Sequence, residues 1–230
     1  MAAALETLLD ALPRVTHAVV MGDLVSSERA THIDALHQRF NIVVSEANQR
    51  HARAIVSPLT ITLGDEFQGL CDTLEGGLAL IRDLRAALLV SGLECRFVLG
   101  VARLQTPVNR IAAWNMMGPG LADARRRLDD KRDPNAYRFE LLAEPELQGL
   151  LEAVGASLTE IEAGWTPRQQ EVVLASQVET AVSLAQRLGM SVQTLYKIRR
   201  AGRFDLYTRQ WAALAAMAGR FDRTLGLAAA

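Results

Sequence analysis

The chain has 230 residues and a net charge of −1; half of its residues are hydrophobic and 22% are charged. This balance is typical of a folded globular protein and excludes an intrinsically disordered chain. Residues 1–12 lack the basic segment of a signal peptide, and no apolar run reaches the roughly 18 to 20 residues of a membrane helix. We therefore expect a cytoplasmic protein without a membrane partner.

Charge is distributed unevenly along the chain. Residues 1–164 contain 16 Lys and Arg against 22 Asp and Glu, whereas residues 165–230 contain nine against four. A basic C-terminal part attached to a larger acidic part is typical of a small domain that faces a polyanion. The two cysteines, Cys71 and Cys95, form no CxxC pair, so we assign them no metal or redox chemistry.

Strand and helix patterns alternate through the first 142 residues. A short amphipathic helix is expected over residues 1–12. Strands are then expected over residues 17–21, 54–63, 66–70, 95–104 and 137–142, and helices over residues 30–52, 74–91 and 121–131. This order resembles the split βαβ or ferredoxin-like arrangement. The turn signal at residues 64–65 makes a central antiparallel hairpin, which argues against a doubly wound parallel sheet.

Two acidic motifs lie at the ends of predicted strands. Asp23 follows the first strand, and small residues come directly after it; Asp65 occupies the predicted hairpin turn. If the two strands are neighbours, these carboxylates converge, and converging carboxylates commonly share a divalent cation such as Mg²⁺. The alternative is that both are turn-forming aspartates exposed to water, because Gly-Asp is a common turn dipeptide.

Longer stretches around these motifs resemble a known family. GDLVSSER at residues 22–29, ITLGDEFQGL at 61–70, RFVLGVARL at 96–104 and MGPGLADARRRL at 117–128 are together similar to SatD family proteins. That family is in turn similar to the palm-type class III nucleotidyl cyclases and to GGDEF domains. The resemblance implies a palm-like domain that binds a purine nucleotide together with Mg²⁺ or Mn²⁺.

The resemblance also implies roles for individual residues. The metal ligands would be Asp23, Asp65 and the Leu24 carbonyl, and Arg125 would be the transition-state arginine if the site is active. Ser26, Ser27 and Glu28 would line the phosphate side.

Two positions depart from the enzymes' pattern. Leu121 stands where cyclases have an asparagine, and Leu63 stands where diguanylate cyclases have a glycine. Synthesis of cyclic di-GMP is therefore not expected. The arginines at residues 125–127, with Lys131 and Arg132, form a basic stretch that is more often a solvated helix face than a phosphate clamp.

The C-terminal part carries a second informative pattern. Thr166, Pro167 and Gln169 form a capping signature for a helix that runs to about residue 177. A helix over 180–188, the turn residue Gly189 and a second helix over 192–201, capped by Ser191, then make a helix-turn-helix.

In a helix-turn-helix the second helix enters the major groove of DNA. Base contacts are expected from Ser191, Gln193, Thr194 and Lys197, and backbone contacts from Arg199, Arg200 and Arg203. The alternative is a motif used for packing or dimerisation. The last helix, over residues 205–221, is expected to close this small core or to pair with a second copy of the chain.

These patterns predict an α+β protein: a ferredoxin-like or palm-type sheet with helices on one face, followed by an all-α helix-turn-helix domain. The expected limits are 1–145 for the palm-like domain, 146–164 for a helical linker and 165–230 for the helix-turn-helix domain. We expect a homodimeric DNA-binding regulator whose palm-like domain binds a nucleotide or a divalent metal. The alternatives are a metal-dependent nucleotidyl cyclase or nucleotidyltransferase and a catalytically inactive scaffold.

Overall fold

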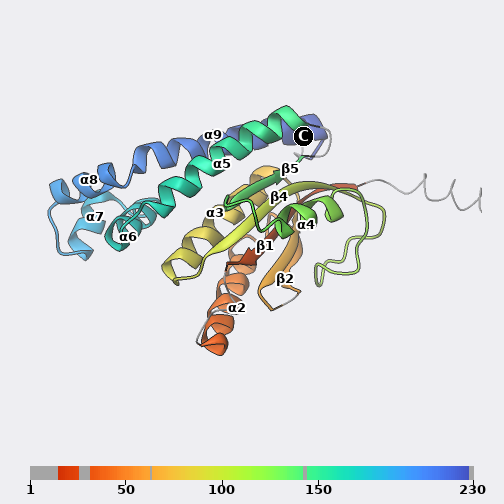
Figure 1. The fold of residues 1–230 in the computed structure, drawn as a ribbon, viewed down its shortest axis with the longest axis horizontal. Coiled ribbons are helices and arrows are strands. Elements are labelled where there is room, and N and C mark those ends of the chain that lie inside the picture. The colour runs from red at the N-terminus through yellow and green to blue at the C-terminus, as the bar shows by residue number, and fades with distance from the viewer. Residues whose placement is uncertain (1–14, 26–31, 63, 142–143, 228–230) are drawn as a thin grey trace, which may run out of the picture.

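A computed structural model describes residues 15–25, 32–62, 64–141 and 144–227. Figure 1 shows a twisted sheet flanked by helices, with a long helix pair leading to a small helical unit. The strands are β1 (Val15–Leu24), β2 (Ile55–Ile61), β3 (Glu66–Cys71), β4 (Cys95–Leu104) and β5 (Tyr137–Glu140). The helix expected over residues 1–12 lies outside the described residues.

The sheet has the order β2-β3-β1-β4-β5. All neighbouring strands are antiparallel except β4 and β5, which are parallel. The four strands β1 to β4 therefore have the ferredoxin-like arrangement, with β5 added at one edge, and the predicted α+β class is confirmed. The central hairpin of β2 and β3 is also present.

Helices cover both faces of this sheet, so the expectation that they lie on one face alone was wrong: the strands carry apolar side chains on the second face too, and these need a covering helix. On one face lie α2 (Ile33–Arg50) and α3 (Leu74–Val90), whose apolar sides pack into the larger hydrophobic core. In addition, α4 (Leu121–Asp129) packs on the opposite face, which we call the α4 face. The buried side chains of that second layer include Val19, Met21, Leu70 and Val98. Alternation along β1 explains the division, because successive side chains of a strand point to opposite faces.

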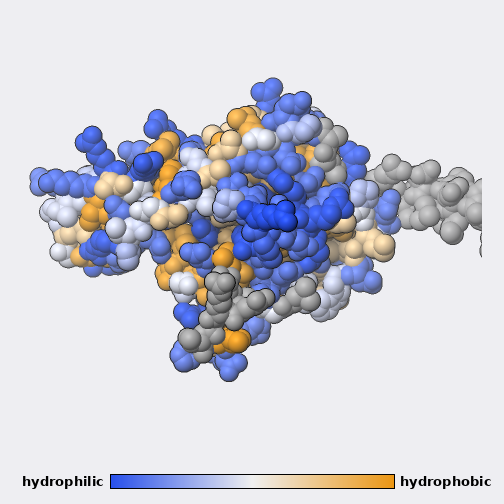
Figure 2. Space-filling model, in the orientation of Figure 1, coloured by the Kyte–Doolittle hydropathy of each residue, from blue (hydrophilic) through white to orange (hydrophobic). Residues whose placement is uncertain are grey.

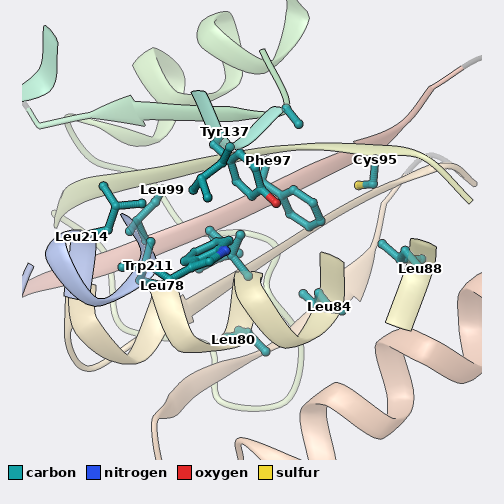
Figure 3. Close-up of a cluster of buried hydrophobic side chains, with 14 of the residues drawn as sticks. Leu78, Leu80, Leu84, Leu88, Cys95, Phe97, Leu99, Tyr137, Trp211 and Leu214 are labelled. Carbon is teal, nitrogen blue, oxygen red and sulfur yellow. The ribbon is translucent and has the colours of Figure 1, made fainter. Parts of the chain in front are cut away.

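The larger core also takes in the last helix of the chain. The two long helices α5 (Pro145–Ala163) and α9 (Phe204–Leu225) are in contact and run beside each other in Figure 1. Trp211 and Leu214 of α9 lie with Tyr137, Leu99 and Leu78 in the core (Figure 3). The expectation that this helix closes the small core was therefore wrong, because its apolar stripe packs on the sheet body. Pairing with a second copy stays a prediction.

Asp222 fixes α9 to the start of α3. Its carboxylate accepts hydrogen bonds from the backbone N–H groups of Leu74 (2.7 Å) and Glu75 (2.9 Å). These are first-turn donors of α3 that have no partner within the helix. Thr73, the N-cap of the same helix, accepts a third hydrogen bond from the Gly76 N–H. A C-terminal side chain thus completes the cap of a helix in the sheet body.

A separate small core holds the helical unit between α5 and α9. This unit consists of α6 (Pro167–Ala175), α7 (Ala181–Arg187) and α8 (Val192–Ala201). The buried side chains of the small core are Val172, Leu184, Ala185 and Leu195. The limits expected at residues 145 and 165 remain a prediction, but the larger core does not end there, since it includes side chains of both α5 and α9. Within the described ranges, no helix has the length and apolar character that crossing a membrane requires.

Candidate functional site

Asp23 lies at the end of β1 and is buried, with 5% of its side chain exposed. It points to the α4 face, because it is two and four residues beyond Met21 and Val19 on the same strand. Its Oδ2 atom accepts hydrogen bonds from Lys131 Nζ (2.5 Å) and Arg96 Nη1 (3.3 Å). A buried carboxylate with two cationic partners is well compensated for the loss of water.

The residue opposite Asp23 on β3 is Glu66. Its Oε2 accepts a hydrogen bond from Arg125 Nη1 (2.5 Å), and Arg125 Nη2 donates to Gln68 Oε1 (3.1 Å). Arg125 therefore lies at the acidic end of the sheet, where its carboxylate partner is Glu66; its role as a transition-state arginine stays a prediction. We call Asp23, Glu66, Arg96, Arg125 and Lys131 the charged cluster.

Asp65 lies beside the end of β1 through its backbone. The Leu24 N–H donates a hydrogen bond to the Asp65 carbonyl at 3.0 Å. The hairpin tip and the strand end that carry the two predicted metal aspartates are therefore adjacent. Ser26, Ser27 and Glu28, predicted to line the phosphate side, lie outside the described residues.

The fit of this site to a divalent cation depends on Lys131. In the part of the chain that the structure describes, no group of three or more His, Cys, Asp or Glu side chains is placed to hold a metal ion. At Asp23, the Lys131 ammonium contacts the carboxylate oxygen that a metal would use. As arranged here, the residues do not fit the ion. The 55% exposure of the Lys131 side chain leaves it free to move toward solvent.

Sequence reasoning missed three members of the charged cluster. Arg96 and Glu66 occupy positions directly opposite Asp23 on the two neighbouring strands, so strand register alone places them there. The alternation of β3 and β4 could have indicated that both side chains share a face with Asp23. Lys131 follows α4, and no sequence pattern connects it to a residue 108 positions earlier.

Both cysteines are buried, free thiols. Burial raises the pKa of Cys71 to about 12, with the nearby Asp72 carboxylate adding to the effect. Burial likewise raises the pKa of Cys95. Both thiols therefore stay protonated near neutral pH and are poor nucleophiles.

A side chain caps the start of each of the three helices in the helix-turn-helix unit. Thr166 forms a capping box with Gln169 at the start of α6, and Thr180 accepts a hydrogen bond from the Ser183 N–H at the start of α7. Ser191 Oγ accepts one from the Thr194 N–H (3.1 Å) at the start of α8. Gly189 has φ +64°, the left-handed conformation that glycine adopts without steric cost. The predicted capping residues and the turn glycine are confirmed.

Most of the predicted DNA-contacting side chains lie on the outside of α8. Leu195 is buried, whereas Gln193, Thr194, Lys197 and Arg200 are exposed. Ser191 and Arg203, at the two ends of the helix, are exposed as well. Arg199 is placed differently: it is half-buried, and its guanidinium lies over the Phe204 ring, 3.8 Å from the centroid. This cation–π contact fixes α8 to the start of α9.

The sheet and the helix-turn-helix unit together define an α+β protein with a palm-like body and a small appended helical unit. The SatD family model matches residues 17–216, and the chain belongs to that family. No curated protein matches the sequence well enough to count as a relative.

Two similar solved structures are both described as a bacterial light-regulated adenylyl cyclase. They superpose with TM-scores of 0.37 and 0.36 at 13% sequence identity. Each match covers 54% of this chain and 43% of the cyclase chain, so the chain matches less than half of their length.

Proposed function

We propose that this SatD family protein is a cytoplasmic DNA-binding regulator, in which α8 contacts DNA and the palm-like body binds a purine nucleotide. Two copies would act together, because helix-turn-helix proteins commonly read two half-sites as dimers. This proposal joins the two sites in one mechanism: ligand binding to the body would change how the helix-turn-helix unit meets DNA.

The observation that carries the proposal is the division of α8 into two faces. Its inner face supplies Leu195 to the small core, and its outer face presents Gln193, Thr194, Lys197 and Arg200 together. Amide and hydroxyl groups can contact base edges, and the two cations can contact phosphates. A helix that paired with another copy through its outer face would need apolar side chains there.

The nucleotide part of the proposal is supported by the charged cluster. Two cations meet at Asp23, and a third meets Glu66 on the next strand. An anionic ligand could attract Lys131 and Arg96 away from Asp23, because both cations contact the same carboxylate oxygen, Asp23 Oδ2.

The DNA-binding half can be tested by selection of duplexes from a random library, followed by measurement of affinity by fluorescence anisotropy. The test variant is Lys197→Ala/Arg200→Ala. Its control is Arg220→Ala/Arg223→Ala, which removes the same charge from exposed positions near the far end of α9. The test variant should lose about tenfold or more in affinity and the control should not. Equal affinities of both variants and the wild type would contradict the proposal.

The nucleotide half can be tested by thermal unfolding with ATP or GTP, with and without Mg²⁺ or Mn²⁺. A ligand at a hundred times its dissociation constant stabilises the fold by about 2.7 kcal/mol. The stabilisation should occur in the wild type and be absent from Arg96→Ala/Lys131→Ala, which removes the two cations that would bind the phosphates. Chromatography of the nucleotides then tests turnover: a new product would favour a nucleotidyl cyclase or transferase over a regulator. No stabilisation by any nucleotide would contradict this half.

A further inference from the structure

A cavity of about 530 Å³ lies on the α4 face of the sheet. Its floor consists of β1 and β3 side chains, its wall is the start of α4, and its roof is the loop 105–120. A volume of this size is typical of a small-molecule site. The lining residues that matter most below are Met21, Gln68, Gln105, Met116, Met117 and Arg125.

The roof is held in place by close backbone packing. A Cβ atom added to Gly118 would lie 2.0 Å from the Arg103 carbonyl oxygen, and one added to Gly120 would lie 2.0 Å from that of Val101. Only glycine leaves room for the loop to approach β4 this closely. The MGPG sequence at residues 117–120, which the proposed function does not use, therefore fixes the loop and the start of α4 against β4.

Hydrogen bonds to side chains tie the middle of the roof to the hairpin. The Ala113 N–H donates to Thr60 Oγ1 (2.9 Å), and the Ala113 carbonyl accepts a hydrogen bond from the Gln68 amide. Ser57 Oγ donates to the Asn109 carbonyl at 2.5 Å. The cavity is thus preformed by the fold, and a ligand entering it would not have to order the loop.

The interior is mainly apolar and adaptable. Met21 lies in the sheet, whereas Met116 and Met117 come from the roof. Thioethers contact aromatic rings favourably and adjust to their shape. Among the lining residues of the described chain, the polar ones are Gln68, Gln105 and Arg125. The Gln105 side chain is exposed and can hydrogen-bond the edge of a ring, while Gln68 is already bonded to Arg125 and the roof.

The cavity adjoins the charged cluster. Met21 and Asp23 lie two residues apart on the same face of β1, and Gln68 and Glu66 have the same relation on β3. Such a step along a strand is about 7 Å. Arg125 lines the cavity and also donates to Glu66, so it belongs to both places.

We infer that this cavity binds a purine nucleoside moiety, with the flat base against the roof methionines Met116 and Met117 and the phosphate end directed toward the charged cluster. The inference rests on the nucleotide binding proposed above and names where the base lies. An uncharged aromatic ring fits the apolar interior, and an anionic end fits Arg125 at its edge and Arg96 and Lys131 outside it.

The test is titration of adenosine, guanosine and ribose 5-phosphate, followed by the fluorescence of Trp114 in the roof. Trp114→Phe identifies the part of the signal that comes from this residue. The test variant is Ala122→Phe, which fills the cavity from an exposed position on α4; its control is Arg126→Phe on the same helix, outside the lining. Gln105→Ala provides a second test variant that adds no bulk.

A nucleoside should bind the wild type and Arg126→Phe alike, and about tenfold more weakly to Ala122→Phe because the added ring takes the volume of the base. Gln105→Ala should weaken binding by a smaller factor, and ribose 5-phosphate should bind much more weakly than either nucleoside. Equal nucleoside affinity in Ala122→Phe and the wild type, or no nucleoside binding at all, would overturn the inference. If ATP still stabilises Ala122→Phe fully, nucleotide binding stands and only the place of the base is wrong; DNA affinity, measured separately, does not enter this result.

Discussion

The sheet body and the helix-turn-helix unit are stabilised by different kinds of contact. In the body, aromatic rings follow one another across the core, from Phe40 through Phe67, Phe97 and Tyr137 to Trp211, with centroids 5.2–6.3 Å apart. The small core of the helix-turn-helix unit has four buried aliphatic side chains, and the unit has three caps. The body is therefore stabilised by a large core, whereas the unit has a small core and an outer surface available for binding.

A buried carboxylate adds hydrogen bonds to the contacts that stabilise the body. Glu162 of α5 accepts hydrogen bonds from Arg85 of α3 (2.8 Å), Tyr137 of β5 (2.5 Å) and Tyr207 of α9 (2.8 Å). Burial and the Glu162 carboxylate raise the pKa of both tyrosines, so they remain hydrogen-bond donors at neutral pH. One side chain thus joins four elements of the body.

Polar hydrogen bonds contribute to the junction between body and unit, beside Val173 of α6, which is buried in the larger core. Arg82 of α3 donates to Gln177 at 2.7 Å, and Gln170 of α6 donates to the Leu89 carbonyl at 2.9 Å. Such contacts exchange readily with water, and each contributes about 1 kcal/mol to stability. The unit should therefore open without unfolding the body.

The largest effect is expected from Glu162→Ala. It leaves the buried Arg85 guanidinium and two tyrosine hydroxyls without their shared acceptor, and loss of one partner of a buried pair costs about 3–5 kcal/mol. Urea unfolding should show this loss of stability, while Glu160→Ala, at an exposed position of the same helix, should change little. Equal effects of the two variants would mean that the Glu162 contacts do not stabilise the body.

A somewhat smaller effect is expected from Leu195→Ala. This residue is fully buried in the small core, and such truncations cost about 2–5 kcal/mol. Hydrogen exchange should show loss of protection in residues 167–201, with β1 and β4 still protected. Simultaneous loss in β1 and β4 would show that the two regions unfold as one unit.

Local patterns were sufficient to predict most elements of both regions. Strand alternation and turn signals identified β1 to β5, and capping residues such as Thr166 and Ser191 located the starts of α6 and α8. The packing of α9 could not be predicted in this way. Its apolar stripe fits any apolar surface, and only the tertiary fold selects the sheet body as its partner.

The candidate site shows the same limit. The position of Asp23 at a strand end follows from the sequence, but its partners Arg96 and Lys131 come from β4 and from the segment after α4. Pairing of such distant residues depends on register and on the path of the loop. The place of Arg199 over Phe204 was likewise missed, because basic residues at the end of a recognition helix commonly bind phosphates.

The smallest effect is a loss of stability at acid pH, which we expect in the body alone. All four histidines lie before residue 165, and His17 of β1 is buried, with burial and then Arg110 lowering its pKa below 6.5 while Asp72 opposes this. A histidine with a lowered pKa contributes full stability above pH 6.5 and loses it as pH falls toward the folded-state pKa.

One proton accounts for at most about 1.4 kcal/mol per pH unit. Unfolding measured from pH 7 to 5 should therefore show a loss of stability that is smaller in His17→Leu. The same pH dependence in the variant would assign the loss to other groups.

The most direct test of the central claim is the salt dependence of DNA affinity. Each phosphate contact contributes about −0.9 to the slope of log K against log salt. We predict that Lys197→Ala/Arg200→Ala reduces the magnitude of this slope by roughly 1 to 2, whereas Arg220→Ala/Arg223→Ala leaves it unchanged. Identical slopes in all three proteins, or no measurable DNA binding by the wild type at low salt, would contradict the claim that the outer face of α8 binds DNA.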